Sequence, residues 1–262
     1  MAVRSAILNV MVAAAEKAAR PLKRDFGEIE HLQVSQKGPS DFVTAADLRT
    51  EKILHAELSK ARPDFGFYME ESGETAGADA DRRWIIDPID GTINFIHGIP
   101  HVAISIALEE HGEITAALIY NPILEETFMA EKGQGATVNN RRIRVSARTA
   151  LHDCVVATGI PHRGRGDHES YLPQLAAVME ATSGIRRLGS AALDLAYVAA
   201  GRCDAFWESG LQYWDIAAGL LLVREAGGYV TSLDGKSKDV DGSSVLAANP
   251  TLHRTLTGLL AV

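Results

Sequence analysis

The stretch WIIDPIDGTINF, residues 84–95, ends an apolar run with two aspartates and follows them at once with Gly-Thr. Trp84-Ile85-Ile86 has the pattern of a buried strand, and Asp87 lies where that strand should emerge. Pro88 fixes φ and has no N–H to donate to a sheet, so we expect the chain to leave the sheet there. Asp90 follows three residues after Asp87. Both carboxylates are therefore expected near the end of one strand.

The two residues after Asp90 favour an anion-binding turn. Gly91 permits a close backbone approach, and Thr92 is suited to open a helical turn, which would leave the amides of both residues facing outward. Two carboxylates beside a phosphate would repel it, so the arrangement makes chemical sense mainly when cations lie between them. Mg²⁺ takes hard oxygen ligands, and two such ions ~3.5–4 Å apart can activate a water and steady the attacking and leaving oxygens.

A site of this kind needs further carboxylates. Glu70-Glu71, at the end of the strand FGFYM, and Asp215, behind Trp214 at the start of a helix, are the candidates. Each has an ordinary structural explanation when taken alone: a solvated turn for the glutamates, and complementing the helix dipole for Asp215. It is their combination with the opening stretch that favours a functional role.

A nucleophilic aspartate is the alternative within phosphatase chemistry. Enzymes that form an aspartyl-phosphate in the manner of haloacid dehalogenases carry the pattern DxDx[TV] near the N-terminus. Here the spacing is Asp87-x-x-Asp90. This difference favours direct attack by water over a covalent intermediate.

The composition narrows the class of protein. The chain has 262 residues, of which 46% are hydrophobic, and a formal charge of −8. This negative charge argues against sequence-independent binding to nucleic acid or to an anionic membrane. The basic spots at residues 141–144 and 186–187 fit a solvated strand edge or loop. Cys154 and Cys203 are too few for a disulfide framework, and no run approaches the ~18 apolar residues needed to cross a bilayer. We therefore expect a cytoplasmic protein without a membrane partner.

The hydrophobic pattern predicts long helices together with a mostly antiparallel set of strands. The region from His101 to about Val145 alternates apolar runs with turn signals, which is typical of antiparallel strands rather than βαβ units. A layered α/β or α+β architecture follows, with residues 1–262 as a single domain. The helices are predicted at 4–24, 44–61, 168–182, 190–200, 214–226 and from 252, and further strands at 65–69, 83–87, 153–159, 205–207 and in GYVTSL and SSVLAAN.

Other short motifs carry no chemistry. The GxG at residues 133–135 has no third glycine and no following helix, so a dinucleotide-binding fingerprint is rejected. His97 and His101 form an HxxxH pattern, but Gly98 and Pro100 between them prevent the single helical face that zinc ligands need. No GxSxG elbow supports a serine hydrolase.

Taken together, the motifs resemble the inositol monophosphatase family of Mg²⁺-dependent, lithium-sensitive phosphatases, and in particular its bacterial branch of inositol-1-monophosphatases and extragenic suppressor proteins. The resemblance spans nearly the whole chain. It is carried by Lys37-Gly38-Pro39-Ser40-Asp41-Phe42-Val43-Thr44, Ala46-Asp47, Glu70-Glu71-Ser72, Asp87-Pro88-Ile89-Asp90-Gly91-Thr92-Ile93-Asn94-Phe95, Gly189-Ser190-Ala191-Ala192, Trp214-Asp215-Ile216-Ala217-Ala218-Gly219 and Glu225-Ala226-Gly227-Gly228.

The resemblance implies a metal site and a fold. One Mg²⁺ would be held by Glu70, Asp87 and the carbonyl of Ile89, and a second by Asp87, Asp90 and Asp215. Glu70 would help to place a third, weaker ion through water, which makes two to three ions per site. The implied fold is an αβαβα sandwich, in which layers of helices and sheets alternate, and a homodimer is common in the family.

The resemblance also implies roles around the water and the substrate. Thr92, paired with Asp47, would orient and deprotonate the attacking water, so Asp47 would serve both as a helix cap and in catalysis. The amides of Gly91 and Thr92 would hold the phosphate. The positions expected to contact hydroxyls of the alcohol are Asp90, Ala191 and Glu208.

The predicted function is hydrolysis of myo-inositol monophosphate by a metal-activated water, and two alternatives stay open. The same chemistry on fructose 1,6-bisphosphate or another small phosphate ester is one, because relatives on this scaffold differ in substrate and the loop at 159–168 maps to no particular one. A regulatory role is the other, since some bacterial relatives are linked to RNA polymerase and ribosomal RNA synthesis.

Overall fold

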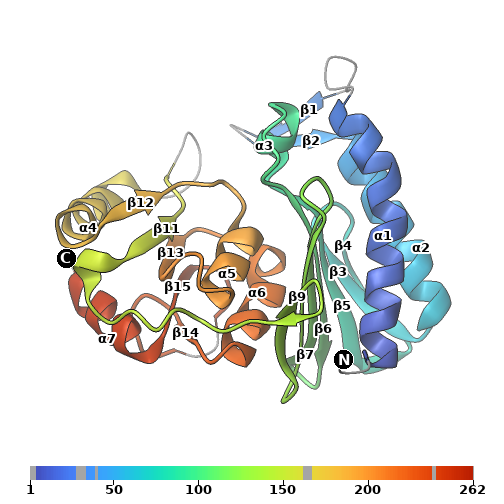
Figure 1. Cartoon of the computed structure of the whole chain (residues 1–262). Coiled ribbons are helices and arrows are strands. Elements are labelled where there is room, and N and C mark those ends of the chain that lie inside the picture. The colour runs from blue at the N-terminus through green and yellow to red at the C-terminus, as the bar shows by residue number, and fades with distance from the viewer. Residues whose placement is uncertain (1–3, 28–33, 39–40, 162–166, 238–239, 262) are drawn as a thin grey trace.

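Helices and sheets alternate in five layers across the computed structural model, which describes residues 4–27, 34–38, 41–161, 167–237 and 240–261 (Figure 1). Helices α1 and α2 cover one face of a large sheet, α5 and α6 lie between that sheet and a smaller one, and α4 and α7 cover the outer face of the smaller sheet. The predicted αβαβα sandwich is therefore confirmed. Pro39 and Ser40, and residues 162–166 of the loop at 159–168, lie outside the described residues.

The helices follow the sequence pattern closely. In α1 the apolar residues Leu8, Met11, Ala15 and Leu22 recur at helical spacing and are buried, and the helix runs on through Pro21. The helical bounds are α1 Ala6–Gly27, α2 Ala45–Ala61, α3 Thr92–Ile96, α4 His168–Ala181, α5 Ala191–Ala199, α6 Tyr213–Glu225 and α7 Pro250–Leu259.

The larger sheet has eight strands in the order β10-β9-β8-β7-β6-β5-β3-β4, and all neighbours in it are antiparallel except β3 and β5. The predicted antiparallel run between His101 and Val145 is confirmed as five of these strands. The bounds are β3 Phe65–Met69, β4 Gly73–Thr75, β5 Asp79–Asp90, β6 Ala103–Glu110, β7 Glu113–Asn121, β8 Glu126–Glu131, β9 Gly135–Val138 and β10 Arg141–Arg142.

The smaller sheet has the order β12-β11-β13-β15-β14, with β11 parallel to both of its neighbours. A separate hairpin pairs β1 with β2 just before α2. The bounds are β1 Val34–Gly38, β2 Asp41–Thr44, β11 Val155–Thr158, β12 Gly184–Arg186, β13 Ala205–Ser209, β14 Tyr229–Thr231 and β15 Ser244–Ala248. Within the described part of the chain, no helix has the length and apolar composition to span a membrane.

The expectation that the chain leaves the sheet at Pro88 is wrong. Strand β5 continues to Asp90, because a β-bulge accommodates the proline: Asp87 pairs with Ser105 and Asp90 with Ala103, so β5 has one residue more than β6 in this interval. A bulge leaves one residue unpaired, which is where a proline is tolerated in a sheet. In a regular strand, residues 87 and 90 would face opposite sides. The extra residue allows both carboxylates to reach the same cavity.

Candidate active site

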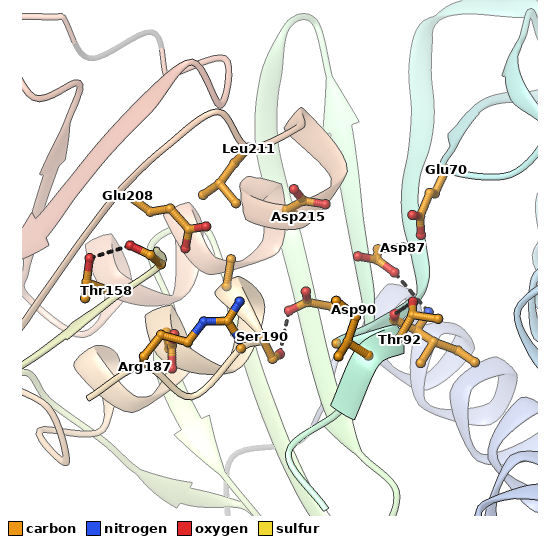
Figure 2. A pocket seen from close by; sticks show the side chains of 17 residues that line it. Glu70, Asp87, Asp90, Thr92, Thr158, Arg187, Ser190, Glu208, Leu211 and Asp215 are labelled. Carbon is orange, nitrogen blue, oxygen red and sulfur yellow. Dashed lines mark hydrogen bonds between the residues drawn. The ribbon is translucent and has the colours of Figure 1, made fainter. Parts of the chain in front are cut away.

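The molecule has two halves, one built on the larger sheet and one on the smaller sheet (Figure 1). One cavity between them contains most of the residues singled out from the sequence. It lies where the end of β5 meets the N-terminal ends of α5 and α6 (Figure 2). Nine of the ten predicted site residues line it, and the tenth, Asp47, is hydrogen-bonded to one of them. The predicted residues that line the cavity are Glu70, Asp87, Ile89, Asp90, Gly91, Thr92, Ala191, Glu208 and Asp215.

Six carboxylates line this cavity, and the four singled out as metal ligands come from the region of three elements. Asp87 and Asp90 lie on the bulged end of β5. Glu70 directly follows β3, and its backbone N donates to the carbonyl oxygen of Ile86 (3.2 Å), which continues the pairing of β3 with β5 by one residue. Asp215 lies in the first turn of α6, where its Oδ2 accepts from the backbone N of Gln212 (2.8 Å). Figure 2 shows the four side chains around a common space.

Burial makes negative charge costly at this cluster. Burial first, and then the neighbouring carboxylates Glu70, Asp90 and Asp215, raise the pKa of Asp87 well above its usual range. Burial and Asp215 raise the pKa of Asp90 to about 7. Like charges that share a buried site disfavour one another's ionised forms, and a divalent cation between them removes that penalty.

The donor set fits Mg²⁺ in chemistry but is not a closed cage. Every side-chain donor in the cluster is a hard oxygen, as Mg²⁺ prefers. In the described residues, no three His, Cys, Asp or Glu side chains are gathered closely enough to bind one ion by themselves. An ion held here would therefore need the Ile89 carbonyl, water or substrate oxygens among its ligands, which is usual for Mg²⁺.

Asp90 is held in place from the second half of the molecule. Its Oδ2 accepts hydrogen bonds from Ser190 Oγ (2.5 Å) and from the backbone N of Ala192 (2.7 Å), at the start of α5. Ser190 is also the N-cap of α5, because its Oγ accepts from Leu193 N (3.3 Å). Ser190 was quoted from the sequence as part of a motif, but its role in holding Asp90 was not predicted.

Thr92 and Asp47 form the predicted pair. Thr92 Oγ1 lies 3.3 Å from Asp47 Oδ1 and 3.1 Å from the carbonyl oxygen of Ile89, both of which can accept its single proton. The other carboxylate oxygen of Asp47 accepts from the backbone N of Thr44 (2.8 Å) and from Thr44 Oγ1 (2.6 Å), which completes the predicted capping box of α2. Burial raises the pKa of Asp47 to about 6, and the bonds from Thr44 oppose that rise.

Gly91 cannot be replaced without strain. Its φ is +95°, a conformation that residues with a Cβ rarely adopt. A Cβ there would also lie 3.0 Å from the carbonyl oxygen of His101 and 3.2 Å from that of Gly189. The backbone at Gly91 therefore passes through a gap that only glycine fits, directly before the short helix α3.

The far wall of the cavity contains residues that sequence reasoning missed. Thr158 ends β11 and Gly159 follows it, Arg187 follows β12, Asp194 lies on α5, and Leu211 precedes α6. Each lies more than sixty residues from the opening stretch along the chain. Arg187 belongs to the basic spot at 186–187, which was interpreted from the sequence as a solvated strand edge or loop and here borders the cavity. Arg187 is the one cationic side chain among the described residues that line the cavity.

Comparison with known proteins agrees with this geometry. Residues 4–261 match the family described as the inositol monophosphatase family. The inositol-1-monophosphatase of Mesorhizobium japonicum is 59% identical over 97% of this chain and 95% of its own length, and the Nus factor SuhB of Escherichia coli is 41% identical over 95% of this chain and 94% of its own length. The crystal structure of the extragenic suppressor protein suhB from Bartonella henselae superposes with a TM-score of 0.95 at 57% identity, covering 98% of this chain and 99% of that one. The chain belongs to the inositol monophosphatase family.

Proposed function

We propose that this protein is a Mg²⁺-dependent phosphomonoesterase that hydrolyses myo-inositol monophosphate to inositol and phosphate by direct attack of water. The observation that carries the proposal is one cavity that combines the four carboxylates proposed as metal ligands with the Gly91 turn and the Thr92–Asp47 pair. The relative named inositol-1-monophosphatase, which matches nearly the whole chain, supports the choice of substrate.

The carboxylates would divide between the ions as the family resemblance implies. Glu70, Asp87 and the Ile89 carbonyl would hold one Mg²⁺, and Asp87, Asp90 and Asp215 a second, with Glu70 placing a third through water. The three aspartates would have to draw closer together than they stand here to share the second ion. Bound Mg²⁺ supplies charge neutralisation for the phosphate and a lowered pKa for the attacking water. A cation would favour the ionised forms of Asp87 and Asp90, whose pKa values are raised by burial and by the neighbouring carboxylates.

The chain's own residues would handle the proton of the attacking water. A hydroxyl carries one proton, so Thr92 can accept a bond from water while it donates to Asp47. Asp47 must be ionised to receive that proton, and its other oxygen is held by Thr44. The new bond joins the water oxygen to phosphorus and the ester P–O bond breaks. The leaving alkoxide oxygen takes up a proton from solvent water, and Asp47 returns the proton that it received to solvent. The amides of Gly91 and Thr92 would bind the phosphate oxygens.

The alcohol half would lie against the far wall. Asp90, Ala191 and Glu208 are the proposed contacts for its hydroxyls, and all three line the cavity. Inhibition by Li⁺, a homodimer and the number of ions are further proposals that rest on the family resemblance, and a location in the cytoplasm is a proposal that rests on the composition. The organisation of residues 1–262 as a single domain likewise stays a prediction.

A test of the substrate is a panel of inositol phosphate, fructose 1,6-bisphosphate, histidinol phosphate and adenosine 3′,5′-bisphosphate, each with Mg²⁺ and with or without Li⁺. We expect the highest kcat/KM for inositol monophosphate, and inhibition by Li⁺. A clear preference for either bisphosphate would replace the proposed substrate but keep the chemistry. Absence of Mg²⁺-dependent turnover on every ester would reject the phosphatase proposal.

Replacing Gly159 by alanine should impair substrate binding more than folding. A Cβ at Gly159 would lie 1.9 Å from Cδ of Glu208 and about as close to both carboxylate oxygens. The backbone of Gly159 is held by a bond from Thr158 Oγ1 to its carbonyl oxygen (2.9 Å), so the flexible end of Glu208 must move instead. We expect KM for inositol monophosphate to rise roughly tenfold, the loss of about one hydrogen bond to a charged group, with kcat nearly unchanged. An unchanged KM would remove Glu208 from the proposed substrate contacts.

The stability of the metal-free protein should fall as pH rises. Burial raises the pKa of Asp90 to about 7, so its stabilising contribution is fully present below the ordinary pKa near 3.8 and is lost as pH rises through about 7. In EDTA we expect a lower Tm at pH 8 than at pH 5.5, and a larger gain in Tm on adding Mg²⁺ at pH 8. Thermal melts at the two pH values, with and without Mg²⁺, check this. Equal Mg²⁺ effects at both would argue against ligation by buried carboxylates.

A regulatory role is a second candidate, favoured by relatives of 41–42% identity that are named Nus factor SuhB. The two roles are separable, because a protein that only contacts transcription factors needs no carboxylate cavity. Capture of RNA polymerase or ribosome-linked proteins from extract by both wild type and a metal-site variant would support it. Robust phosphatase activity with no such capture would reject it.

A further inference from the structure

A buried acid–base pair, His101 and Asp194, lies at the edge of the cavity, which Asp194 lines, and neither residue is in the set of site residues predicted from the sequence. Asp194 is 1% exposed and His101 is 9% exposed. His101 Nε2 and Asp194 Oδ1 are 3.6 Å apart, and neither atom has a hydrogen-bond partner among the described residues. Buried polar atoms without hydrogen bonds are uncommon in native proteins, so each such atom needs an explanation.

The two residues belong to different halves of the molecule. His101 lies in the segment between α3 and β6, which belongs to the larger sheet, whereas Asp194 lies in the first turn of α5, beside the smaller sheet. The same two segments are also joined by Asn94, whose Nδ2 donates to the carbonyl oxygens of His101 (2.9 Å) and Leu188 (2.8 Å). The two segments are therefore linked twice: by the contact between the side chains of His101 and Asp194, and by the bonds from the Asn94 side chain to backbone carbonyl oxygens.

Two functional residues occupy the space between these segments. Gly91 passes between the carbonyl oxygens of His101 and Gly189, where a Cβ would lie 3.0 and 3.2 Å from them. Asp90 is bonded to Ser190 and to the backbone N of Ala192, one turn before Asp194. The spacing of the two segments thus sets where the Asp90 carboxylate and the Gly91 amide stand.

Burial disfavours a charge on either of the two side chains. Burial raises the pKa of Asp194 well above its usual range, whereas burial lowers the pKa of His101, so a single charge on either residue is disfavoured. The loss of one partner from a buried pair leaves the other uncompensated, which costs more than the loss of both. The best-attested use of such pairs is to fix one arrangement of the chain against alternatives.

We propose that His101 and Asp194 are a positioning pair: their contact holds the start of α5 against the segment before β6 and thereby sets Asp90 and Gly91 for metal and phosphate. Neither residue needs to touch the reacting atoms. The consequence for turnover rests on the proposed function, whereas the consequence for Mg²⁺ affinity can be measured without turnover.

The test compares variants that separate the contact from its packing. The ring of His101 packs edge-on against Tyr197, with centroids 5.3 Å apart, so His101→Phe keeps a ring but removes the donor, whereas His101→Gln keeps a donor but removes the ring. By calorimetry we expect His101→Phe to weaken Mg²⁺ binding roughly tenfold and His101→Gln by less than about threefold. Adding Asp194→Asn to His101→Phe should recover part of the loss, because it removes the buried carboxyl group that has lost its partner.

The control is Asp204→Asn, which alters an equally buried aspartate away from the cavity. Asp204 is 2% exposed and accepts from the backbone N of Val155 (2.8 Å), so its variant should lower Tm while the Kd for Mg²⁺ stays at the wild-type value. Better binding by His101→Phe than by His101→Gln, or independent losses in the double variant, would overturn the proposal. Wild type that binds Mg²⁺ but hydrolyses no ester would defeat the proposed function alone, and wild type that binds no Mg²⁺ would defeat both.

Discussion

Replacing Asp90 by asparagine is expected to lower kcat for inositol monophosphate by at least about 10³-fold, comparable to or above the loss of one oxyanion-hole donor. Asp90 is proposed to ligate one Mg²⁺ and to contact the substrate, so the change removes a negative charge where the cation would lie. Asparagine can still accept the bonds from Ser190 and Ala192 through its carbonyl oxygen. The shape of the site should therefore survive while its affinity for the ion falls.

Metal-free stability separates this explanation from simple unfolding. Above about pH 7 the buried carboxyl of Asp90 becomes ionised, which lowers the stability of the metal-free folded protein. Asparagine does not ionise, so Asp90→Asn in EDTA at pH 8 should melt at the wild-type temperature or above it. Kinetics, Mg²⁺ titration and thermal melts on the same preparation make the comparison. A folded variant with wild-type turnover in Mg²⁺ would show that the metal assignment is wrong.

The fold could be predicted well wherever local patterns decide it. The strand at 65–69 was predicted to the residue, and helix α2, over Ala45–Ala61, begins one residue after the predicted start because Thr44 caps it from outside. The end of β5 was wrong, because Pro88 excludes a regular strand but not a bulge, and a bulge depends on the partner strand. The hairpin of β1 and β2 and the short strands β4 and β12 were also missed, since strands this short have little periodicity.

The candidate site divides in the same way. The carboxylates near the opening stretch were found because Asp87, Asp90 and the following Gly-Thr form a local pattern. The residues that hold them in place were not, because Ser190 and Asp194 reach the cavity only through packing of α5 against the larger sheet. Roles that depend on contacts across a hundred residues leave no trace in local spacing.

Removal of the Thr92 hydroxyl is the second large effect we expect. Thr92→Ala should lower kcat by about 10²–10⁴-fold, the range for a positioned proton-transfer group, while the Kd for Mg²⁺ changes by less than about threefold. Thr92→Ser keeps the hydroxyl and should keep most of the activity. Asp47→Asn should lose activity similarly, because an amide can accept the bond from Thr92 but cannot take up its proton.

The matched control for Asp47 is Thr44→Ala, which breaks the capping box without touching Thr92. The loss of an N-cap costs ~1 kcal/mol, or about 2–4 °C in Tm for a chain of this size, and kcat at pH 8 should stay near wild type. The acid limb of the pH profile should move, however. Burial raises the pKa of Asp47 to about 6 and the Thr44 hydroxyl opposes that rise, so kcat falls below about pH 6 in wild type and at higher pH in Thr44→Ala.

The double variant Thr92→Ala/Asp47→Asn decides whether the two side chains act as one unit. If Thr92 delivers the water's proton to Asp47, removing either group already abolishes the transfer, so the double variant should be about as slow as the worse single variant. Two independent roles would instead multiply the two losses. If kcat of the double variant falls by the product of the two single losses while the Kd for Mg²⁺ is unchanged, the proton path through Thr92 is contradicted. Asp47 would then act only as a cap of α2.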